Sequence, residues 1–281
     1  MLWKKTLRGA EQYQQGSMKI PRSTQEMIPV KRILNDGTFV LDSGEYSKMF
    51  AFTDINYTEL RDEEKMRRLV DYSALLNSID KGIYAKISIF FRPIRQEQFE
   101  RDVLIPMNPE DELDDYRENM NTVLREQVRG TLGMTKQAYL TITAVRRNDE
   151  DAAAFFARVE GNLISSFQAL GVELRAVPLS ERLRLLHDIY RPGLEETFRF
   201  DAHAEKKLGM NWKDSIAPLS AEALNSCTHL KIGGRYCKTL FLNAYPIYLN
   251  DRVVSDIASI GKPMIFTIDF LPIPSAEAMA E

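Results

Sequence analysis

The order of strand and helix patterns between Lys48 and Leu179 most strongly constrains what this chain can fold into. The run ending in "MFAFTDI" is rich in β-forming residues, and so is the later run "YAKISIFFRPI". Between them, "ELRDEEKMRRLVDYSALLNSID" places apolar residues at three- and four-residue steps with a charged opposite face. The pattern therefore predicts a strand, an amphipathic helix and a second strand.

The same order recurs further along the chain. "QAYLTITAVRR" and "VELRAVPL" predict strands, and "NDEDAAAFFARVEGNLISSFQALG" between them predicts a helix with acidic residues in its first turn and Gly171 just after its end. Two βαβ units in succession predict an α+β fold with a ferredoxin-like split βαβ module, whose antiparallel sheet carries both helices on one face. A further helix is expected at about residues 111–130, as an insertion between the two halves.

Turn signals predict a small β-meander ahead of this module. Asn35-Asp36-Gly37 and Asp42-Ser43-Gly44 separate short β-rich runs, as in hairpins, and three strands are expected. After the second βαβ unit, "SERLRLLHDIYRPG" predicts a short helix capped by Ser180. We therefore expect an N-terminal arm at 1–30, the meander and ferredoxin-like module at 31–192, and a second α+β part at 193–281.

The second part carries an incomplete strand–helix–strand pattern. "THLKIGGRYCKTLFLNAYPIYL" predicts a hairpin that turns at Gly233-Gly234, and "KPMIFTIDFLPIP" predicts a later strand. The stretch "TLFLNAYPIY", a helix and "PMIFTIDFLPI" repeat the first half of the ferredoxin-like module. Ser275 and the helix formers after it predict the beginning of another helix, so we expect the chain to be a truncated piece of a longer protein.

Composition excludes several classes of protein. The chain has 281 residues, a net charge of −3 and a pI of about 5.8, which argues against a nucleic-acid coat because such proteins carry a basic domain. Cys227 and Cys237 are too few for a disulfide framework. The N-terminus lacks the apolar run of a signal peptide, and no stretch is apolar enough to span a bilayer. We expect a cytoplasmic protein, peripheral to the membrane through its partners.

Nucleotide and metal motifs are incomplete. "GKP" at Gly261 has Pro263 where a phosphate-binding loop requires a hydroxyl, and "KIGGRY" is better explained as a hairpin turn. Cys227, His229 and Cys237 are one ligand short of a structural zinc site. We therefore predict no cofactor-binding or metal-ligating residues.

Candidate catalytic residues also have simpler explanations. His187 is expected to be a half-buried helix residue whose neighbour Asp188 faces another way, and neither it nor His203 completes a Ser-His-Asp arrangement. Asp54 and Asn56 at a strand end suit turns and caps. The acidic run complements the start of a solvated helix and consists of Glu110, Asp111, Glu112, Asp114 and Asp115. We therefore predict no catalytic residues.

RNA recognition on a ferredoxin-like sheet usually depends on a Lys/Arg-Gly-aromatic signature on one strand, and none of the predicted strands carries it. The basic pairs Arg67-Arg68 and Arg146-Arg147 are too sparse to define a groove for single strands. A binding or docking module is the interpretation that these motifs leave.

An ordered series of segments resembles a known family. "KIPRSTQEMIPVKRILNDGTFVLDSGEYSKMFAFTDINY", "LLNSID", "FFARVEGNLISSFQALG", "ERLRLLHDIYRPGLEETF" and "RYCKTLFLNAYPIYLNDRVVSDI" are similar to the N-terminal region of conjugative-transfer ATPases of the CagE/TrbE/TraE type, as in integrative conjugative elements of Gram-positive bacteria. In that family the region precedes a RecA-like motor that energises type IV secretion and DNA transfer. The resemblance carries no catalytic residue over to this chain.

The resemblance implies a non-catalytic docking or assembly domain that links the motor to the inner-membrane transfer complex. The implied partners are membrane proteins of that complex, the motor region and neighbouring subunits of the same protein, with a homo-oligomer possible and no direct nucleic-acid contact. Two alternatives stay open: a stand-alone ferredoxin-like nucleic-acid-binding protein, and an unrecognised hydrolase or transferase. Function must be argued from a site, so the second alternative rests on little.

Overall fold

The computed structural model describes most of the chain in two compact units. The described residues are 21–53, 60–79, 82–93, 96–127, 134–201, 207, 209, 211–223, 229–241, 256–257, 260 and 262–272. The first unit combines Met1–Pro29 with Leu183–Phe241, and the second combines Val30–Arg182 with Leu242–Glu281. These divisions differ from the three predicted segments, because the segment before residue 30 belongs with the region after 182, and residues from 242 onward belong with the predicted ferredoxin-like module.

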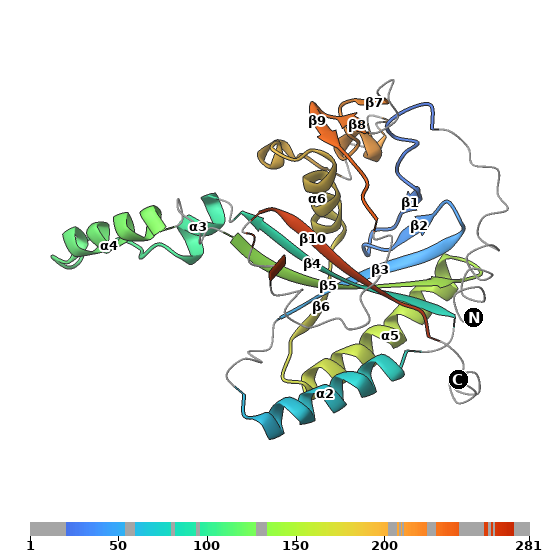
Figure 1. Ribbon diagram of the computed structural model, residues 1–281, viewed down its shortest axis with the longest axis horizontal. Coiled ribbons are helices and arrows are strands. Elements are labelled where there is room, and N and C mark those ends of the chain that lie inside the picture. The colour runs from blue at the N-terminus through green and yellow to red at the C-terminus, as the bar shows by residue number, and fades with distance from the viewer. Residues whose placement is uncertain are drawn as a thin grey trace. The chain divides into compact units, whose positions relative to one another are not determined.

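The second unit is built on a seven-stranded antiparallel sheet (Figure 1). Its path runs β1-β2-β3-β5-β4-β10, and β6 also pairs with β3. Mixed helices and an antiparallel sheet confirm the predicted α+β class. The strands are β1 (Val30–Ile33), β2 (Phe39–Leu41), β3 (Glu45–Phe52), β4 (Ile83–Pro93), β5 (Met134–Val145), β6 (Leu174–Ala176) and β10 (Met264–Phe270).

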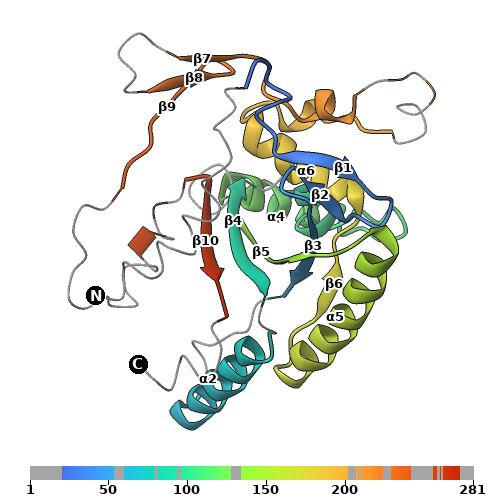
Figure 2. The same ribbon diagram turned by 90° about the vertical axis from the view of Figure 1, so that its right-hand side faces the viewer.

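The strand neighbours within this sheet are those of a split βαβ module. β6, β3, β5 and β4 lie side by side in that order, with every pair antiparallel. Helices α2 (Asp62–Asn77) and α5 (Asp149–Ala169) connect the strands and cover the same face of the sheet (Figure 2). Both helices start with three acidic residues in the first turn, which favours those positions as helix N-termini.

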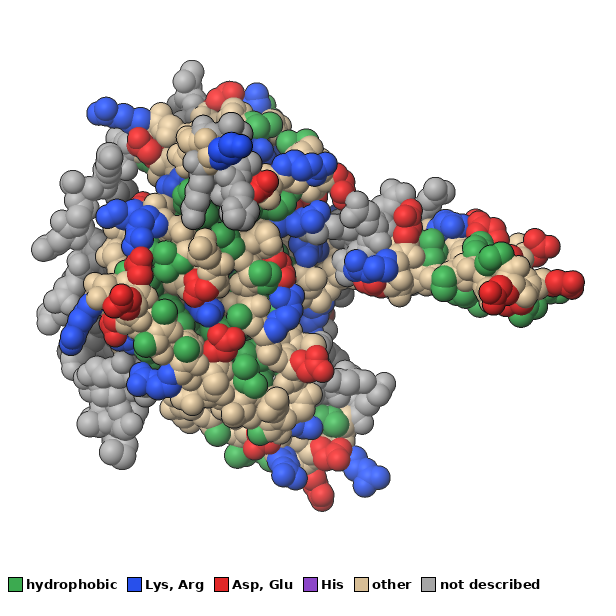
Figure 3. Space-filling view, turned by 180° about the vertical axis from the view of Figure 1, so that it is seen from behind, with side chains coloured by type: hydrophobic (Ala, Val, Ile, Leu, Met, Phe, Trp, Pro, Cys, Tyr) green, Lys and Arg blue, Asp and Glu red, His purple; other side chains and the backbone are tan. Residues whose placement is uncertain are grey.

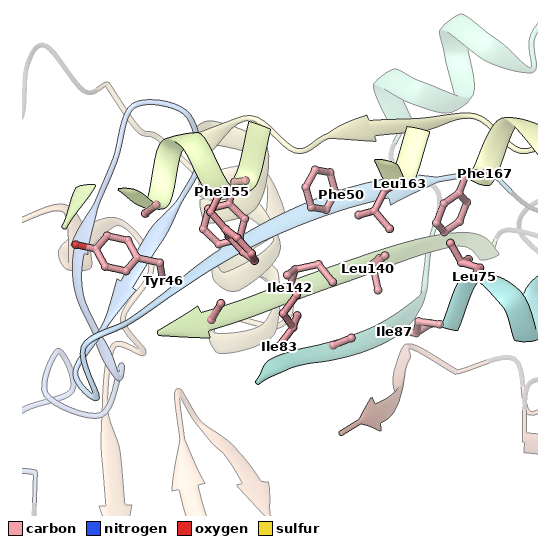
Figure 4. Packing of buried hydrophobic residues seen from close by; sticks show 14 of the residues in the cluster. Tyr46, Phe50, Leu75, Ile83, Ile87, Leu140, Ile142, Phe155, Leu163 and Phe167 are labelled. Carbon is pink, nitrogen blue, oxygen red and sulfur yellow. The ribbon is translucent and has the colours of Figure 1, made fainter. Parts of the chain in front are cut away.

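The core lies between α5, α2 and this face of the sheet (Figure 4). Phe156 and Phe167 of α5 pack with Phe50 of β3 and Leu140 of β5, and Phe50 and Phe156 are completely buried. Leu75 is the buried residue that α2 contributes. Each such side chain stabilises the fold by about 1.5–3 kcal/mol, which explains why the helical and strand periodicities predict these elements well.

β10 extends the main sheet, whereas the sequence predicted it as part of a separate βαβ module. Seven residue pairs join it to β4, from Met264 opposite Phe91 to Phe270 opposite Ala85. An ion pair between Lys86 and Asp269, with 3.3 Å between nitrogen and oxygen, crosses the same two strands. Most of the predicted partner stretch "TLFLNAYPIY" and the predicted helix after Ser275 lie outside the described residues.

The structure differs from the predicted helices at two places. The insertion contains two helices instead of one, α3 (Gln96–Asp102) and α4 (Asp114–Gln127). Helix α6 (Leu179–Tyr190) begins one residue before Ser180, so Ser180 is not its cap. The Pro178 carbonyl accepts a hydrogen bond from Arg182 N at 3.0 Å, which makes Pro178 the capping position.

The first unit is built from short elements. Alongside most of α6 it contains the 3₁₀ helices η2 (Glu195–Thr197) and η3 (Trp212–Ser215) and a three-stranded antiparallel sheet. Its strands are β7 (Ala221–Ala223), β8 (Leu230–Ile232) and β9 (Arg235–Cys237). Gly233 and Gly234 both have positive φ between β8 and β9, which confirms the predicted hairpin turn.

Residues 21–29 are an integral segment of the first unit, although the sequence predicted them as the end of an arm. The Lys213 ammonium donates hydrogen bonds to the carbonyls of Gln25 and Ile28, at 3.3 and 2.9 Å. The Ile28 side chain is 1% exposed. The rest of the predicted arm, residues 1–20, lies outside the described part of the chain.

Candidate docking surface

The cysteine and histidine candidates do not form a metal site in the described structure. Cys227 lies outside the described residues, Cys237 is exposed, and the His229 ring stacks edge-on against Tyr236 at 5.6 Å. Among the residues that the structure describes, no three His, Cys, Asp or Glu side chains are grouped so that they could hold a metal ion.

His187 is completely buried, where the sequence predicted a half-buried residue. Its Nε2 lies 3.4 Å from the Thr197 hydroxyl, and Phe198 stacks edge-on against the ring at 5.3 Å. Its Nδ1 lies 3.5 Å from Asp188 Oδ1, although that carboxylate was expected to face elsewhere. Burial lowers the pKa of His187. A neutral imidazole with no exposed surface is a structural group. The other candidate histidine, His203, is not among the described residues.

The acidic run binds its own arginine. Asp111 and Asp114 both accept hydrogen bonds from the Arg117 guanidinium, at 2.7 Å for Asp114. The hydrogen bonds from Arg117 and from the Leu113 backbone hold the pKa of Asp111 at about 2. The run therefore fixes the start of α4, as its role at a helix N-terminus predicted. Asp54 and Asn56 are outside the described residues.

A cluster that sequence reasoning missed joins β1, β3 and α5. Arg32 donates two hydrogen bonds to the carboxylate of Asp149, at 2.8 and 3.0 Å, and the Tyr46 hydroxyl donates a third at 2.7 Å. They lie beside a shallow cavity of about 520 Å³. The three hydrogen bonds lower the pKa of Asp149 to about 2. A carboxylate so fully satisfied is a poor general base, and the cluster is best explained as a clamp between strand and helix.

Replacing Asp149 by Asn is expected to reduce the acid sensitivity of the fold. The pKa of Asp149 is lower in the folded state than the usual value of 3.8, so its stabilisation is complete above about pH 4 and is lost as the pH falls towards 2. Urea midpoints at pH 7 and pH 3 should therefore differ more for the wild type than for Asp149→Asn. An equal difference in the two proteins would contradict the clamp.

An open groove of about 680 Å³ lies where the ends of β3, β5 and β6 meet α5. Phe52, Lys136 and Gln168 are among its lining residues. Arg175 in the same groove is held by two hydrogen bonds of 2.9 Å to Glu181. This lining mixes apolar and polar groups.

Helix α3, the loop 103–113 and helix α4 form a segment beside the sheet, residues 96–127, in which the loop runs back along α4 (Figure 1). We call this segment the hairpin. Asn121 of α4 is only 2% exposed and closes the hairpin. Its Oδ1 accepts a hydrogen bond from Ile105 N at 2.8 Å, and its Nδ2 donates to Ile105 O at 2.9 Å. Phe99 of α3 is also buried. One face of α4 is therefore occupied within the hairpin itself.

Another face of α4 is apolar and exposed. Leu113, directly before α4, and Tyr116, Met120 and Val123 within it follow one another at steps of three, four and three residues and are 53, 73, 52 and 47% exposed. We call these four residues the α4 seam. Figure 3 shows apolar and acidic side chains together on this segment, at the right of the view. A row of large apolar side chains in water is a feature of interaction surfaces.

None of the helices in the described part of the chain combines the length and apolar character that crossing a bilayer requires. No protein-family model matches the sequence, and no curated protein matches it.

Proposed function

We propose that this chain is a non-catalytic docking module that binds other proteins through the hairpin at residues 96–127. The observation that carries the proposal is the exposed α4 seam, because an uninterrupted row of four large apolar side chains on a helix whose other face is already occupied is a feature of interaction surfaces. The polar clusters described above support the same reading. Arg117 donates hydrogen bonds to Asp111, Arg32 donates hydrogen bonds to Asp149, and His187 is buried.

The ordered resemblance in the sequence supports a more specific form of this proposal. In this form the chain is the N-terminal region of a conjugative type IV secretion ATPase, and it links the motor to membrane proteins of the transfer complex at the inner face of the membrane. The chain then needs no nucleotide-binding loop of its own, and its partners would supply the attachment to the membrane.

Co-expression with membrane proteins of a conjugative transfer complex tests the proposal. The tagged chain should copurify in detergent with at least one of them in a fixed stoichiometry that survives gel filtration, and it should not hydrolyse ATP above the rate of a mock preparation. Failure to form a complex with any of these membrane proteins would contradict the specific form. ATP hydrolysis that follows the chain through repurification would contradict the non-catalytic role.

A further inference from the structure

We infer that the α4 seam binds a basic amphipathic helix of a partner protein, so that the two helices pack as a short two-stranded coiled coil. The inference deepens the proposed docking function and rests on it. It is carried by three features of the hairpin: the spacing of the seam, the prior use of another face of α4, and the charge that surrounds the seam.

The spacing of the seam is that of a coiled coil. Apolar residues at alternating steps of three and four keep one stripe facing a partner helix, which is the a/d pattern of a heptad repeat. Leu113, Tyr116, Met120 and Val123 follow this pattern without interruption. A helix that packs on a sheet usually shows a wider apolar stripe, so this narrow one favours a helix as the occupant.

The hairpin presents this seam outward because its other contacts are already made. Asn121 lies next to Met120 in sequence, and its side chain is fully engaged with the Ile105 backbone. Rotating α4 to bury the seam would break both of these hydrogen bonds and leave buried polar groups unsatisfied, which is costly. The hairpin therefore offers a preformed helix face, which reduces the entropy lost on binding.

Charge decides the chemistry of the occupant. Between Gln96 and Gln127 the sequence has ten Asp and Glu residues and three Arg residues, so the hairpin carries a net charge of −7, against −3 for the whole chain. Both arginines of α4 are held within the hairpin, Arg117 by Asp114 at 2.7 Å and Arg125 by Glu118 at 2.8 Å. The surface around the seam is therefore acidic.

An acidic surface discriminates against two other occupants. A second copy of the chain would bring the same net charge against the seam, and like charges that face each other across an interface weaken it. An anionic membrane surface would also repel it. A partner helix with Leu-like residues at its a and d positions and Lys or Arg at the flanking positions satisfies both the seam and the charge. Because α4 is only 14 residues long, two heptads, we expect binding that depends on this charge attraction and weakens with salt.

A designed peptide tests this inference directly. The probe is a fluorescent peptide of about three heptads with Leu at a and d and Lys at e and g, titrated with the full chain and followed by anisotropy. Its control has the same composition in an order without heptads. The heptad peptide should bind at least about tenfold more tightly than the control, a difference of about 1.4 kcal/mol, and high salt should weaken it.

Two double variants locate the binding surface. Tyr116→Ala with Met120→Ala shortens the seam and should weaken peptide binding at least about tenfold, while circular dichroism shows that the helices are kept, since Ala favours helix. Met66→Ala with Val70→Ala is the matched control on α2, because those side chains are 62 and 60% exposed, and it should leave binding unchanged.

Three results would overturn the inference: equal binding of both peptides, unchanged binding by the seam variant, or a dimer of the wild-type chain in sedimentation that the seam variant abolishes.

The membrane-protein copurification separates this inference from the proposed function. If the seam variant still forms the membrane complex and the peptide does not bind, the coiled-coil inference is wrong and the docking function is retained. If the heptad peptide binds through the seam but no membrane protein copurifies, the role in a conjugative ATPase is wrong and the seam is retained as a helix-binding surface.

Discussion

Gly37→Ala is expected to be among the most destabilising single substitutions in the second unit. Gly37 has a φ of +82°, and a Cβ added there would lie 2.6 Å from the Val177 carbonyl oxygen and 3.3 Å from Leu179 N. Both of these are backbone atoms, so no side chain can swing aside to relieve the overlap. The left-handed conformation alone costs about 1–2 kcal/mol in a residue with a Cβ.

The overlap adds to this cost because the turn is tied down on both sides. Gly37 N donates to the Leu34 carbonyl at 3.1 Å, and Leu34 N donates to the Thr38 carbonyl at 2.8 Å. Moving the turn away from Val177 would strain these bonds, so we expect a total loss of at least about 3 kcal/mol in the free energy of unfolding. Urea unfolding followed by circular dichroism measures it.

Gly44→Ala is the matched control for this prediction. Gly44 has a nearly equal φ of +86° in the next turn of the same meander, but no atom lies within 4 Å of the added Cβ. Only the conformational cost applies there, about 1–2 kcal/mol. The difference between the two variants isolates the close approach to Val177, and equal losses in both would show that no such approach exists.

The two glycines also mark how far the sequence can predict this fold. Asn-Asp-Gly and Asp-Ser-Gly predict both turns from local chemistry, and both are confirmed, since Gly37 and Gly44 have positive φ between the strands of the meander. The close approach of Gly37 to the backbone of Val177 and Leu179 involves a segment that is distant in sequence. The local sequence around Gly37 does not predict it. The same holds for Asp149, whose place in the first turn of α5 was predictable while its bonds to Arg32 and Tyr46 were not.

The spacing of apolar residues predicts the helices and strands that bury one face, but it does not predict elements without such a face. α2, α5 and the strands β3, β4, β5 and β6 were predicted because their apolar residues repeat with a period that matches burial. The position of β10 beside β4 was missed, because a strand pattern does not say which edge it will pair with. α3 was missed because seven residues contain too little periodicity.

The spacing of the α4 seam is present in the sequence, but spacing alone does not say whether an apolar face is exposed. The three-four-three steps predict a helix with an apolar face, and the acidic run beside them suits the helix N-terminus whether that face is buried or not. The structure shows that this face is a surface, because the Tyr116 and Met120 side chains are exposed while Asn121 on the neighbouring face is buried.

Arg182→Ala is expected to destabilise the second unit by about 2–4 kcal/mol. Arg182 is 5% exposed, and its guanidinium donates hydrogen bonds to Gly37 O at 2.9 Å, to Ser47 O at 2.6 Å and to Ser47 Oγ at 2.8 Å. It also lies over the Phe39 ring at 3.8 Å. Burial lowers the pKa of Arg182 because it disfavours the charged form, and the negative charge of Asp36 opposes that effect.

The loss follows from what the truncation leaves behind. Two backbone carbonyls that face the interior would lose their donors, and the space of the side chain would stay empty or collapse onto Phe39. Arg182→Lys should recover only part of the stability, because one ammonium cannot reproduce the fork of donors. Arg175→Ala is the control, since the Arg175 side chain is 58% exposed in its pair with Glu181, and an exposed pair of that kind contributes about 0–1 kcal/mol. Similar urea midpoints for Arg182→Ala and Arg175→Ala would mean that the buried hydrogen bonds do not hold the meander against α6.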